Sequence, residues 1–466
     1  MANKSFADNE LVTFKNSQGL KARGTLLKLS SNFMVFEVYN PYSIVQVSEV
    51  LSDLTISRSE KQIYCGSATV TNIVNTGIIL IVSAVLSDFH WTNTVDITSK
   101  QDVQIEVDHL IKSFEASQKI GAEFKMNVLA IRTFLSDLRN WIEKLEPSAE
   151  KSKVEMNAEF MIKYFDSLFQ KLGQLCREFH QLVLLVSKED LNTYKTFVQN
   201  LLHPFFLSSP FPYRCYSKPL GYAGDYEMMR MIQRENAEGP NLFAKFINVF
   251  YTNIPIANSV KNRTTNLVRL LEEGVKAAEE KGLPYHSLSI GCGPALEIKN
   301  FLDKNSPKIK CHFRLLDFNE ETLNFAVTHG NKAKKDSDCE ITGELNSVHE
   351  LLKRSVSSKY EEEKYDFVYC SGLFDYLSDR VCAKLVKLFY SMVKPGGKVF
   401  VTNMHSNNSD NSMMELAFEW YLIYRGEDVI ESFGQGLGGD QKIFTDSTGV
   451  NLCLEITKPL KEGDTN

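Results

Sequence analysis

Residues 287–295 read Ser-Leu-Ser-Ile-Gly-Cys-Gly-Pro-Ala, an apolar run of strand length that leads into two glycines, Gly291 and Gly293. Glycine adopts backbone conformations that strain other residues, so the chain can turn sharply there and a ligand can approach its main chain. A helical pattern follows, and the first turn of a helix offers free N–H groups to a polar ligand. The stretch predicts a strand, a ligand-binding turn and a helix, although many ordinary turns also contain two glycines.

Asp317 narrows the class of ligand. It ends the next apolar run, CHFRLLD, and lies 24 residues after Gly293. A carboxylate in that position accepts hydrogen bonds from both ribose hydroxyls of a nucleoside. The dinucleotide fingerprint requires a third glycine where Leu296 stands, so the pattern favours S-adenosylmethionine over a nicotinamide dinucleotide as the cofactor.

Strand-length apolar runs alternate with helical segments from Tyr285 onward, among them YDFVYCS (365–371) and GKVFVTNM (397–404). This alternation predicts an α/β fold in which helices cover both faces of a parallel sheet. The ending KIFTDSTGVNLCLEITKP (442–459) reads as an antiparallel hairpin, which closes the sheet of a methyltransferase and not that of a dehydrogenase. We therefore expect a Rossmann-like, seven-stranded methyltransferase domain over residues 268–466.

The preceding residues fall into three parts with different patterns. Residues 1–104 hold short β-type runs such as FMVFEVY (33–39), separated by turn residues, and predict a small β-barrel. Residues 105–206 carry apolar side chains at three- and four-residue steps, which predicts helices, with a break at Glu146-Pro147-Ser148. Residues 207–267 begin with a stretch rich in proline and aromatic residues and are expected to form a lid and a pre-core segment.

Composition limits the partners and the location of the protein. The net charge of −6 argues against a nucleic-acid partner. The nine cysteines form no CxxC pair, so we expect neither a metal site nor a disulfide framework, and a reducing cytoplasm fits best. No apolar run approaches the ~20 residues of a membrane-spanning helix, and no apolar leader is recognisable. The oligomeric state stays open.

Together, the motifs from Gly291 to Lys458 resemble those of class I S-adenosylmethionine methyltransferases. The departures are Ser289, where many members carry an acidic residue, and Ala295, where many carry glycine. A narrower bacterial group, named for the biosynthesis of an extracellular-factor 3-hydroxypalmitic acid methyl ester, is similar over roughly the last two-thirds of the chain. The similarity lies in HPFFLSSPFPYRCYSKPLGYAGDYEMM (203–229), NSVKNRTTNLV (258–268) and EWYLIYRGEDVI (419–430). It implies O-methylation of the carboxyl group of a hydroxy fatty acid.

The expected barrel resembles a PilZ domain, the class that binds cyclic di-GMP, in LLKLSSNFMVFEVY (26–39). An arginine pair grips the phosphates in that family, because the planar guanidinium binds phosphate oxygens in pairs. Only Arg23 precedes the motif here. The missing pair argues against cyclic di-GMP as a partner and leaves a structural or docking role for the barrel.

Candidate cofactor-binding residues lie at the ends of the predicted strands and in the pre-core segment. Beside the two glycines and Asp317, we expect Asn346 next to the adenine and Ser371 after the fourth strand, with Arg263, at the start of a helix, on the methionine carboxylate.

Candidate residues for catalysis are His405, Tyr222 and Tyr424. His405 follows the fifth strand and is the best placed polar group to orient an acceptor or take its proton. Tyr222, with Asp225 and Tyr226, is a candidate for a lid. A helix after the fifth strand is expected to present the remaining candidates for a substrate wall, Trp420, Tyr421, Tyr424 and Arg425.

The expected reaction is methyl transfer to a carboxylate or a hydroxyl of a small, lipid-like acceptor. A carboxylate is already ionised at pH 7 and needs no base, whereas a hydroxyl does. Two alternatives stay open: a regulatory protein in which the barrel controls the methyltransferase domain, and a scaffold that has lost cofactor binding. The intact glycine turn and Asp317 argue against the scaffold.

Overall fold

The computed structural model describes the chain in two compact units. The described residues are 11–29, 33–38, 45–58, 61–75, 79–86, scattered positions between 104 and 115, 119–151, 155–234, 236–335, 337–354 and 364–460. The N-terminal ten residues and the serines of the PilZ-like motif, Ser30 and Ser31, lie outside them. The first unit holds Met1–Gly224, Glu235–Ile254 and Ser409–Tyr421, and the second Asp225–Arg234, Pro255–Asn408 and Leu422–Asn466. The four-part division of the sequence stays a prediction.

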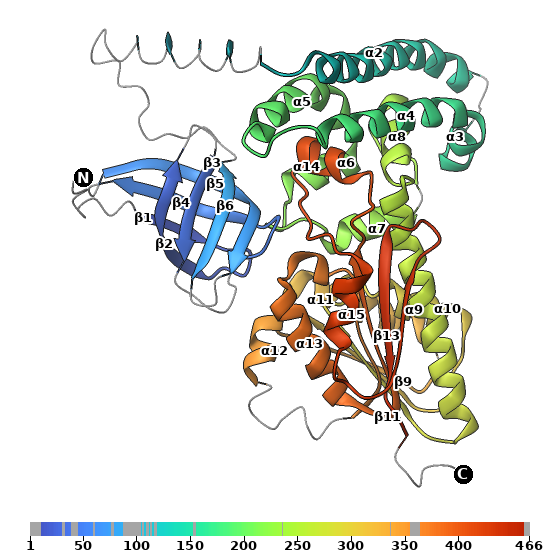
Figure 1. Cartoon of the computed structure of the whole chain (residues 1–466). Coiled ribbons are helices and arrows are strands. Elements are labelled where there is room, and N and C mark those ends of the chain that lie inside the picture. Colours follow the sequence, from blue (N-terminus) through green and yellow to red (C-terminus); the bar gives the residue numbers. More distant parts are fainter. Residues whose placement is uncertain are drawn as a thin grey trace, which may run out of the picture. The chain divides into compact units, whose positions relative to one another are not determined.

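A closed antiparallel β-barrel begins the first unit, as expected (Figure 1). Its strands are β1 (Leu11–Lys15), β2 (Lys21–Leu29), β3 (Phe33–Val38), β4 (Val50–Arg58), β5 (Lys61–Asn75) and β6 (Leu80–Leu86), in the order β1-β2-β3-β6-β5-β4. Buried and partly exposed residues alternate along β3, because successive side chains of a strand point to opposite faces. The inward set, including Phe14, Phe36 and Tyr64, forms the barrel core.

The other elements described in the first unit are helices: α2 (Ala122–Lys151), α3 (Ala158–Tyr164), α4 (Asp166–Val183), α5 (Leu191–Phe206), α6 (Pro210–Ser217), α8 (Leu242–Tyr251) and α14 (Asn411–Phe418). The break expected at Glu146-Pro147-Ser148 is wrong, since α2 continues through Pro147 to Lys151. A proline removes one helical hydrogen bond without preventing one more turn. No described helix is long and apolar enough to cross a membrane.

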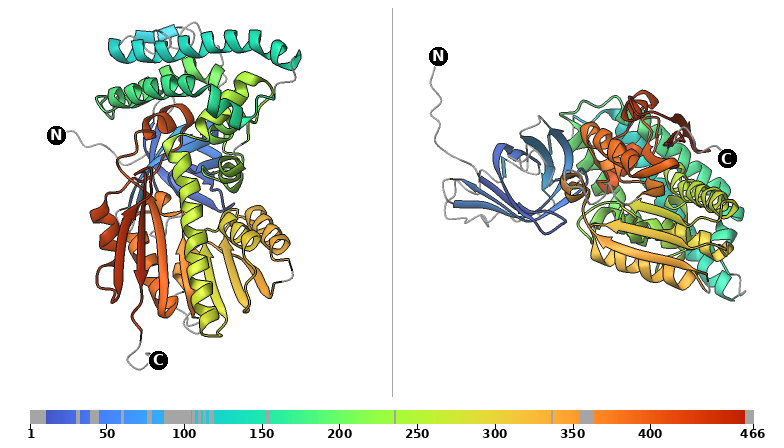
Figure 2. Two further views of the ribbon diagram at one scale, coloured as in Figure 1. Left: turned by 90° about the vertical axis from the view of Figure 1, so that its right-hand side faces the viewer. Right: turned by 90° about the horizontal axis from the view of Figure 1, so that it is seen from below.

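The second unit is built on a seven-stranded sheet, which confirms the α/β, Rossmann-like expectation (Figures 1 and 2). Its strands are β7 (Tyr285–Ile290), β8 (Cys311–Asp317), β9 (Cys339–Leu345), β10 (Tyr365–Cys370), β11 (Val393–Met404), β12 (Asp440–Thr445) and β13 (Asn451–Thr457), in the order β12-β13-β11-β10-β7-β8-β9. Only β13 is antiparallel to the strands on both of its sides. The central strands β7 and β10 are buried almost throughout, as parallel strands with two covered faces must be.

Helices cover both faces of this sheet. Side chains of α9 (Pro255–Glu280), α10 (Leu296–Lys304) and α11 (Glu320–Ala333) share one core with the sheet. Those of α12 (Val348–Arg354), α13 (Asp379–Met392) and α15 (Glu427–Gly434) share the other. The short helix α7 (Tyr226–Arg234) also belongs to this unit.

The chain between α14 and α15 forms no helix, so the helix expected to carry Trp420, Tyr421, Tyr424 and Arg425 is wrong. Glu419 adopts a left-handed conformation with φ 53°, and the Trp420 N–H donates to the Met414 carbonyl at 2.9 Å. A residue in the left-handed conformation commonly ends a helix, because it turns the chain away from the helix axis. Tyr421 and Tyr424 therefore do not share a helix face.

Candidate functional site

The turn after β7 leaves backbone exposed to open space. Gly291 and Gly293 have φ values of 62° and 53°, in the left-handed region that favours glycine. A Cβ atom built on Gly293 would meet nothing within 4 Å, whereas one on Gly291 would come within 3.1 Å of the Leu373 side chain. The main chain at Gly293 is thus the part of the turn that a ligand can approach.

Asp317 closes this turn from the end of the adjacent strand β8. One carboxylate oxygen accepts from the Gly293 N–H at 3.1 Å, and the other from the Asn319 N–H at 3.0 Å. Burial raises the pKa of Asp317 to about 6, although these N–H donors oppose the rise. The Phe318 N–H is a third backbone donor to this carboxylate. A carboxylate offers about four acceptor positions, so at least one remains for a donor such as a ribose hydroxyl.

Two further candidates follow the neighbouring strands. The Asn346 N–H donates to the Asp317 carbonyl at 3.0 Å, and its side-chain amide donates to Glu344 at 3.1 Å. The Ser371 hydroxyl is buried and has no hydrogen-bond partner among the described residues. Because β9, β8, β7, β10 and β11 are parallel neighbours, the residues that follow them lie along one edge of the sheet.

Arg263 lies inside α9, not at the start of a helix as the sequence suggested, and is only 8% exposed. Its guanidinium lies against the Gly372 backbone, because a Cβ atom on that glycine would be 2.7 Å from Nη1. Within the described chain its only hydrogen-bond partner is the Met229 sulfur, 3.8 Å from Nη2. A buried guanidinium normally pairs with a carboxylate, so Arg263 retains donors for an anionic ligand.

Asp375, in the loop after β10, is a buried carboxylate that the sequence analysis missed. One of its carboxylate oxygens accepts from the Met404 N–H at 2.6 Å, and its backbone carbonyl accepts from the Ile423 N–H at 2.7 Å. Burial raises the pKa of Asp375, while Arg263 and Arg425 oppose the rise. A buried carboxyl with a perturbed pKa at such an edge is a candidate for proton transfer. The only sequence signal was an acidic residue within the apolar run SGLFDYL.

His405 directly follows β11 and is 8% exposed. Its backbone N–H donates to the Val450 carbonyl at 2.7 Å, and its Nδ1 accepts from the Asn407 N–H at 2.9 Å. In the neutral ring the proton then lies on Nε2, because an accepting nitrogen carries none. His405 is thereby prepared to donate a hydrogen bond to a ligand oxygen and not to accept a proton at Nε2.

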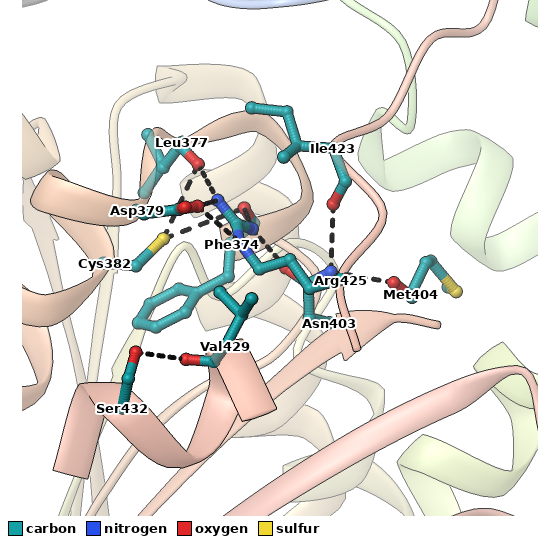
Figure 3. A network of polar contacts seen from close by, with 10 residues as sticks. All are labelled: Phe374, Leu377, Asp379, Cys382, Asn403, Met404, Ile423, Arg425, Val429 and Ser432. Carbon is teal, nitrogen blue, oxygen red and sulfur yellow. Dashed lines mark hydrogen bonds and ion pairs between the residues drawn. The ribbon is translucent and has the colours of Figure 1, made fainter. Parts of the chain in front are cut away.

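Arg425 connects the residues that follow β10 with the end of β11 (Figure 3). Its guanidinium donates to the Phe374 carbonyl at 2.8 Å, to the Leu377 carbonyl, to the Asn403 side chain and to Asp379 at 2.8 Å. The residue is 3% exposed. The side chain predicted for a substrate wall therefore braces the loop after β10 against the end of β11.

The tyrosines are distributed more widely than expected. Tyr222 belongs to the first unit, where its backbone forms a β-bridge with Glu49 of the barrel. Tyr226 begins α7 and donates to Glu321 at 2.7 Å, and Asp225 caps the same helix through the Met228 N–H. Tyr424 directly precedes Arg425 in the segment between α14 and α15 that forms no helix. The lid and the catalytic roles of Tyr222 and Tyr424 stay predictions.

Comparisons with known proteins agree with this geometry. Residues 288–401, from β7 to β11, match the family model described as a methyltransferase domain. No curated protein matches the chain significantly. No cluster of three or more potential metal ligands occurs in the described part of the chain.

Solved structures that match part of the chain include a Bordetella parapertussis protein described as a possible exported protein. It is 16% identical with a TM-score of 0.41, over 53% of this chain and 86% of that one. The N-methyltransferase NodS of Bradyrhizobium japonicum with S-adenosylhomocysteine is 16% identical, TM-score 0.30, over 43% and 88%. Magnesium protoporphyrin IX methyltransferase of Synechocystis with bound S-adenosylmethionine is 10% identical, TM-score 0.32, over 57% and 96%.

Proposed function

Because the second unit holds an S-adenosylmethionine-dependent methyltransferase domain, we propose that it methylates an oxygen atom of a small, lipid-like acceptor. S-adenosylmethionine is the cofactor. The observation that carries the proposed binding mode is the pairing of two complementary groups at one sheet edge. Asp317 has an unused acceptor position beside the open turn, and Arg263 has unused donors beside Gly372.

The residues at this edge fit the functional groups of the cofactor. We assign the two ribose hydroxyls to Asp317, the methionine carboxylate to Arg263 and the main-chain contacts to the turn at Gly291 and Gly293. Asn346, held beside Asp317, is assigned to the adenine, and the unpaired hydroxyl of Ser371 to the methionine end of the cofactor. Ser289 supplies no carboxylate for the methionine amine, and the buried Glu297 is the nearest acidic residue along the chain.

Bound at this edge, the cofactor supplies an electrophilic methyl group on a positively charged sulfur. An acceptor oxygen would take this methyl group, forming an O–C bond as the C–S bond breaks and leaving the electron pair on the sulfur. A carboxylate acceptor has no proton to lose, and Nε2–H of His405 is suited to orient it by donation. A hydroxyl acceptor must lose a proton, for which Asp375 is the better candidate because it is buried at the same edge.

The lipid-like nature of the acceptor is supported chiefly by the resemblance of residues 203–229, 258–268 and 419–430 to the hydroxypalmitic acid methyl ester group. The aromatic residues Phe205, Phe206 and Phe211 of that stretch are buried within the first unit. They are therefore packing residues of the helices, and we assign them no contact with the acceptor. The acidic net charge of −6 supports a small acceptor over a nucleic acid.

Methyl-labelled cofactor tests the acceptor class. Incubation of the full chain with a panel of fatty acids, 3-hydroxy fatty acids and fatty alcohols should place the label in an organic-extractable product. With Asp317→Ala, transfer of the label should be slower at cofactor concentrations near the wild-type dissociation constant, because the variant binds the cofactor more weakly. Label found only in protein or RNA would refute a lipid-like acceptor.

The pH profile at saturating cofactor then separates the two oxygen acceptors. For a carboxylate the turnover should be flat above pH ~6, because that acceptor is ionised well below this value. His405→Ala should lower turnover without changing the profile. For a hydroxyl, turnover should rise with the ionisation of a base, and Asp375→Asn should abolish that rise.

We expect the barrel not to bind cyclic di-GMP tightly. Arg23, the one arginine before the PilZ-like motif, is exposed on β2, and a single guanidinium cannot reproduce the paired grip on two phosphates. Titration of the full chain with cyclic di-GMP should show no submicromolar binding. A submicromolar dissociation constant would favour the alternative in which the barrel is a nucleotide sensor.

A further inference from the structure

The residues Glu419–Arg425, which form no helix and are here called the strap, carry the chain from the first unit back to the second. After β11 the chain leaves the second unit at Asn408, contributes Ser409–Tyr421 to the first and returns at Leu422. The base of this excursion is closed by two backbone hydrogen bonds. The Arg425 N–H donates to the Met404 carbonyl at 3.1 Å, and the Ser406 N–H donates to the Arg425 carbonyl at 3.0 Å.

Within the first unit, the barrel binds the strap through Ser48. The Ser48 hydroxyl donates to the Tyr421 carbonyl at 2.8 Å and also accepts from the Tyr421 N–H. Ser48 is fully buried and has a left-handed backbone, with φ 63°. The next two residues, Glu49 and Val50, pair with the backbone at Gly221 and Tyr222, so this corner of the barrel is itself fixed.

A buried ion pair fixes the beginning of the strap in the same unit. Glu419 binds the ammonium of Lys195 at 2.9 Å and accepts from Gln199 at 3.2 Å. Burial alone would raise its pKa, but Lys195 and Lys218 outweigh it and lower the pKa of Glu419 to about 2. This anchor is therefore ionised at every pH at which the enzyme would be assayed.

Within the second unit, the end of the strap contacts the acceptor edge, by which we mean Asp375 after β10 and His405 after β11, the residues proposed to face the acceptor. The Ile423 N–H donates to the Asp375 carbonyl at 2.7 Å. Arg425 binds the Phe374 carbonyl and the Asn403 side chain near the end of β11 (Figure 3). Asp375 directly follows Phe374, and His405 follows the last residue of β11. The strap thus contacts both elements that present Asp375 and His405.

We propose that the strap is a mechanical link through which the barrel positions the acceptor edge, with Ser48 as a positioning residue for methyl transfer. Tyr421 and Ile423 are two residues apart and can be separated by at most about 7 Å, so releasing Tyr421 acts close to the Ile423 contact along the chain. Releasing Tyr421 from Ser48 loosens the hold of Ile423 and Arg425 on the edge. The link to catalysis rests on the proposed function, whereas the mechanical coupling does not.

Hydrogen–deuterium exchange of the full chain with bound S-adenosylhomocysteine tests the coupling without an acceptor. Ser48→Ala should accelerate exchange of the Ile423 and Met404 amides about tenfold, because local opening becomes easier when the strap is released. Ser52→Ala is the matched control, since its exposed hydroxyl bonds only within the barrel, to the Lys15 carbonyl at 3.3 Å. Equal exchange in both variants would overturn the proposal.

A second variant keeps the contacts of Tyr421 with Ser48 and of Ile423 with Asp375, but lengthens the chain between them by inserting two glycines between Tyr421 and Leu422. With the fatty-acid panel as acceptor, the insertion and Ser48→Ala should each lower kcat about fivefold or more, while calorimetry gives an unchanged dissociation constant for S-adenosylhomocysteine. Combining them should give no further loss, because the insertion has already uncoupled Ser48. Additive losses, or a weaker cofactor affinity, would contradict a link to the acceptor edge.

The two sets of outcomes are separable. If Asp317→Ala leaves cofactor affinity unchanged, the proposed cofactor site fails, but the exchange result still decides whether the strap couples the barrel to Ile423. If the amides of Ile423 and Met404 respond as expected but kcat does not, the coupling exists and the assignment of the acceptor edge is wrong.

Discussion

Asp317→Ala should weaken binding of S-adenosylhomocysteine tenfold or more. Hydrogen bonds to a charged group contribute about 1.5–3 kcal/mol each, and losing one of them already corresponds to roughly tenfold in affinity. Calorimetry measures the effect directly. Asp303→Ala is the control, because Asp303 is an exposed carboxylate on α10 that pairs only with Lys299, four residues before it. Similar small changes in the two variants would remove Asp317 from the cofactor site.

The affinity should also depend on pH through Asp317. Since burial raises its pKa to about 6, the carboxyl of the free protein becomes protonated as the pH falls through that value. Cofactor affinity should then decrease by up to about tenfold for each further pH unit, because the ionised form accepts the ribose donors. The Asp317→Asn variant should bind weakly at every pH and show no such slope.

The same shift has an opposite effect on stability. Between the ordinary pKa of 3.8 and about 6, the folded protein binds more protons than the unfolded chain at this site. Its contribution to the free energy of unfolding therefore falls as the pH rises through this window, by up to about 3 kcal/mol. Thermal unfolding without ligand should show the difference between wild type and Asp317→Asn shifting in favour of Asn from pH 4 to pH 7. A constant difference would contradict the raised pKa.

The site residues that could be predicted from the sequence are those that end a strand or directly follow one. Gly291 and Gly293 follow directly on a buried strand, and Asp317 ends the next one, so parallel pairing is sufficient to bring them together. His405 is likewise placed by the end of β11. The hairpin at the end of the chain also followed from its turn residues and apolar runs.

The missed part depends on contacts between distant residues. The spacing of Tyr421 and Tyr424 suits a helix, but the helix ends at Phe418 because Glu419 turns left-handed and pairs with Lys195, which lies 224 positions away. Arg425 binds the Phe374 carbonyl in the loop after β10. The spacing of apolar residues along the sequence does not predict such a contact between distant segments. Asp375 is a candidate because it is buried, and a single acidic residue within an apolar run does not by itself predict burial.

Arg263→Ala should weaken S-adenosylhomocysteine binding about a hundredfold, which corresponds to the loss of a bidentate, charge-assisted pair worth about 2.7 kcal/mol. Arg263→Lys should fall between the variant and wild type, because an ammonium keeps the charge but cannot form the planar fork. Removing this side chain should cost the free protein less than the ~3–5 kcal/mol expected for breaking a buried ion pair, since no described carboxylate is paired with it.

5′-Methylthioadenosine provides the matched ligand control, because it carries the adenosine of the cofactor but lacks the amino-acid carboxylate. Arg263→Ala should leave its affinity within about twofold of wild type, whereas Asp317→Ala should weaken both ligands by the same factor. Two variants and two ligands measured by calorimetry thus separate the carboxylate contact from the ribose contact. If Arg263→Ala weakens both ligands equally, Arg263 acts by supporting the Gly372 backbone against which it lies and not by binding the carboxylate.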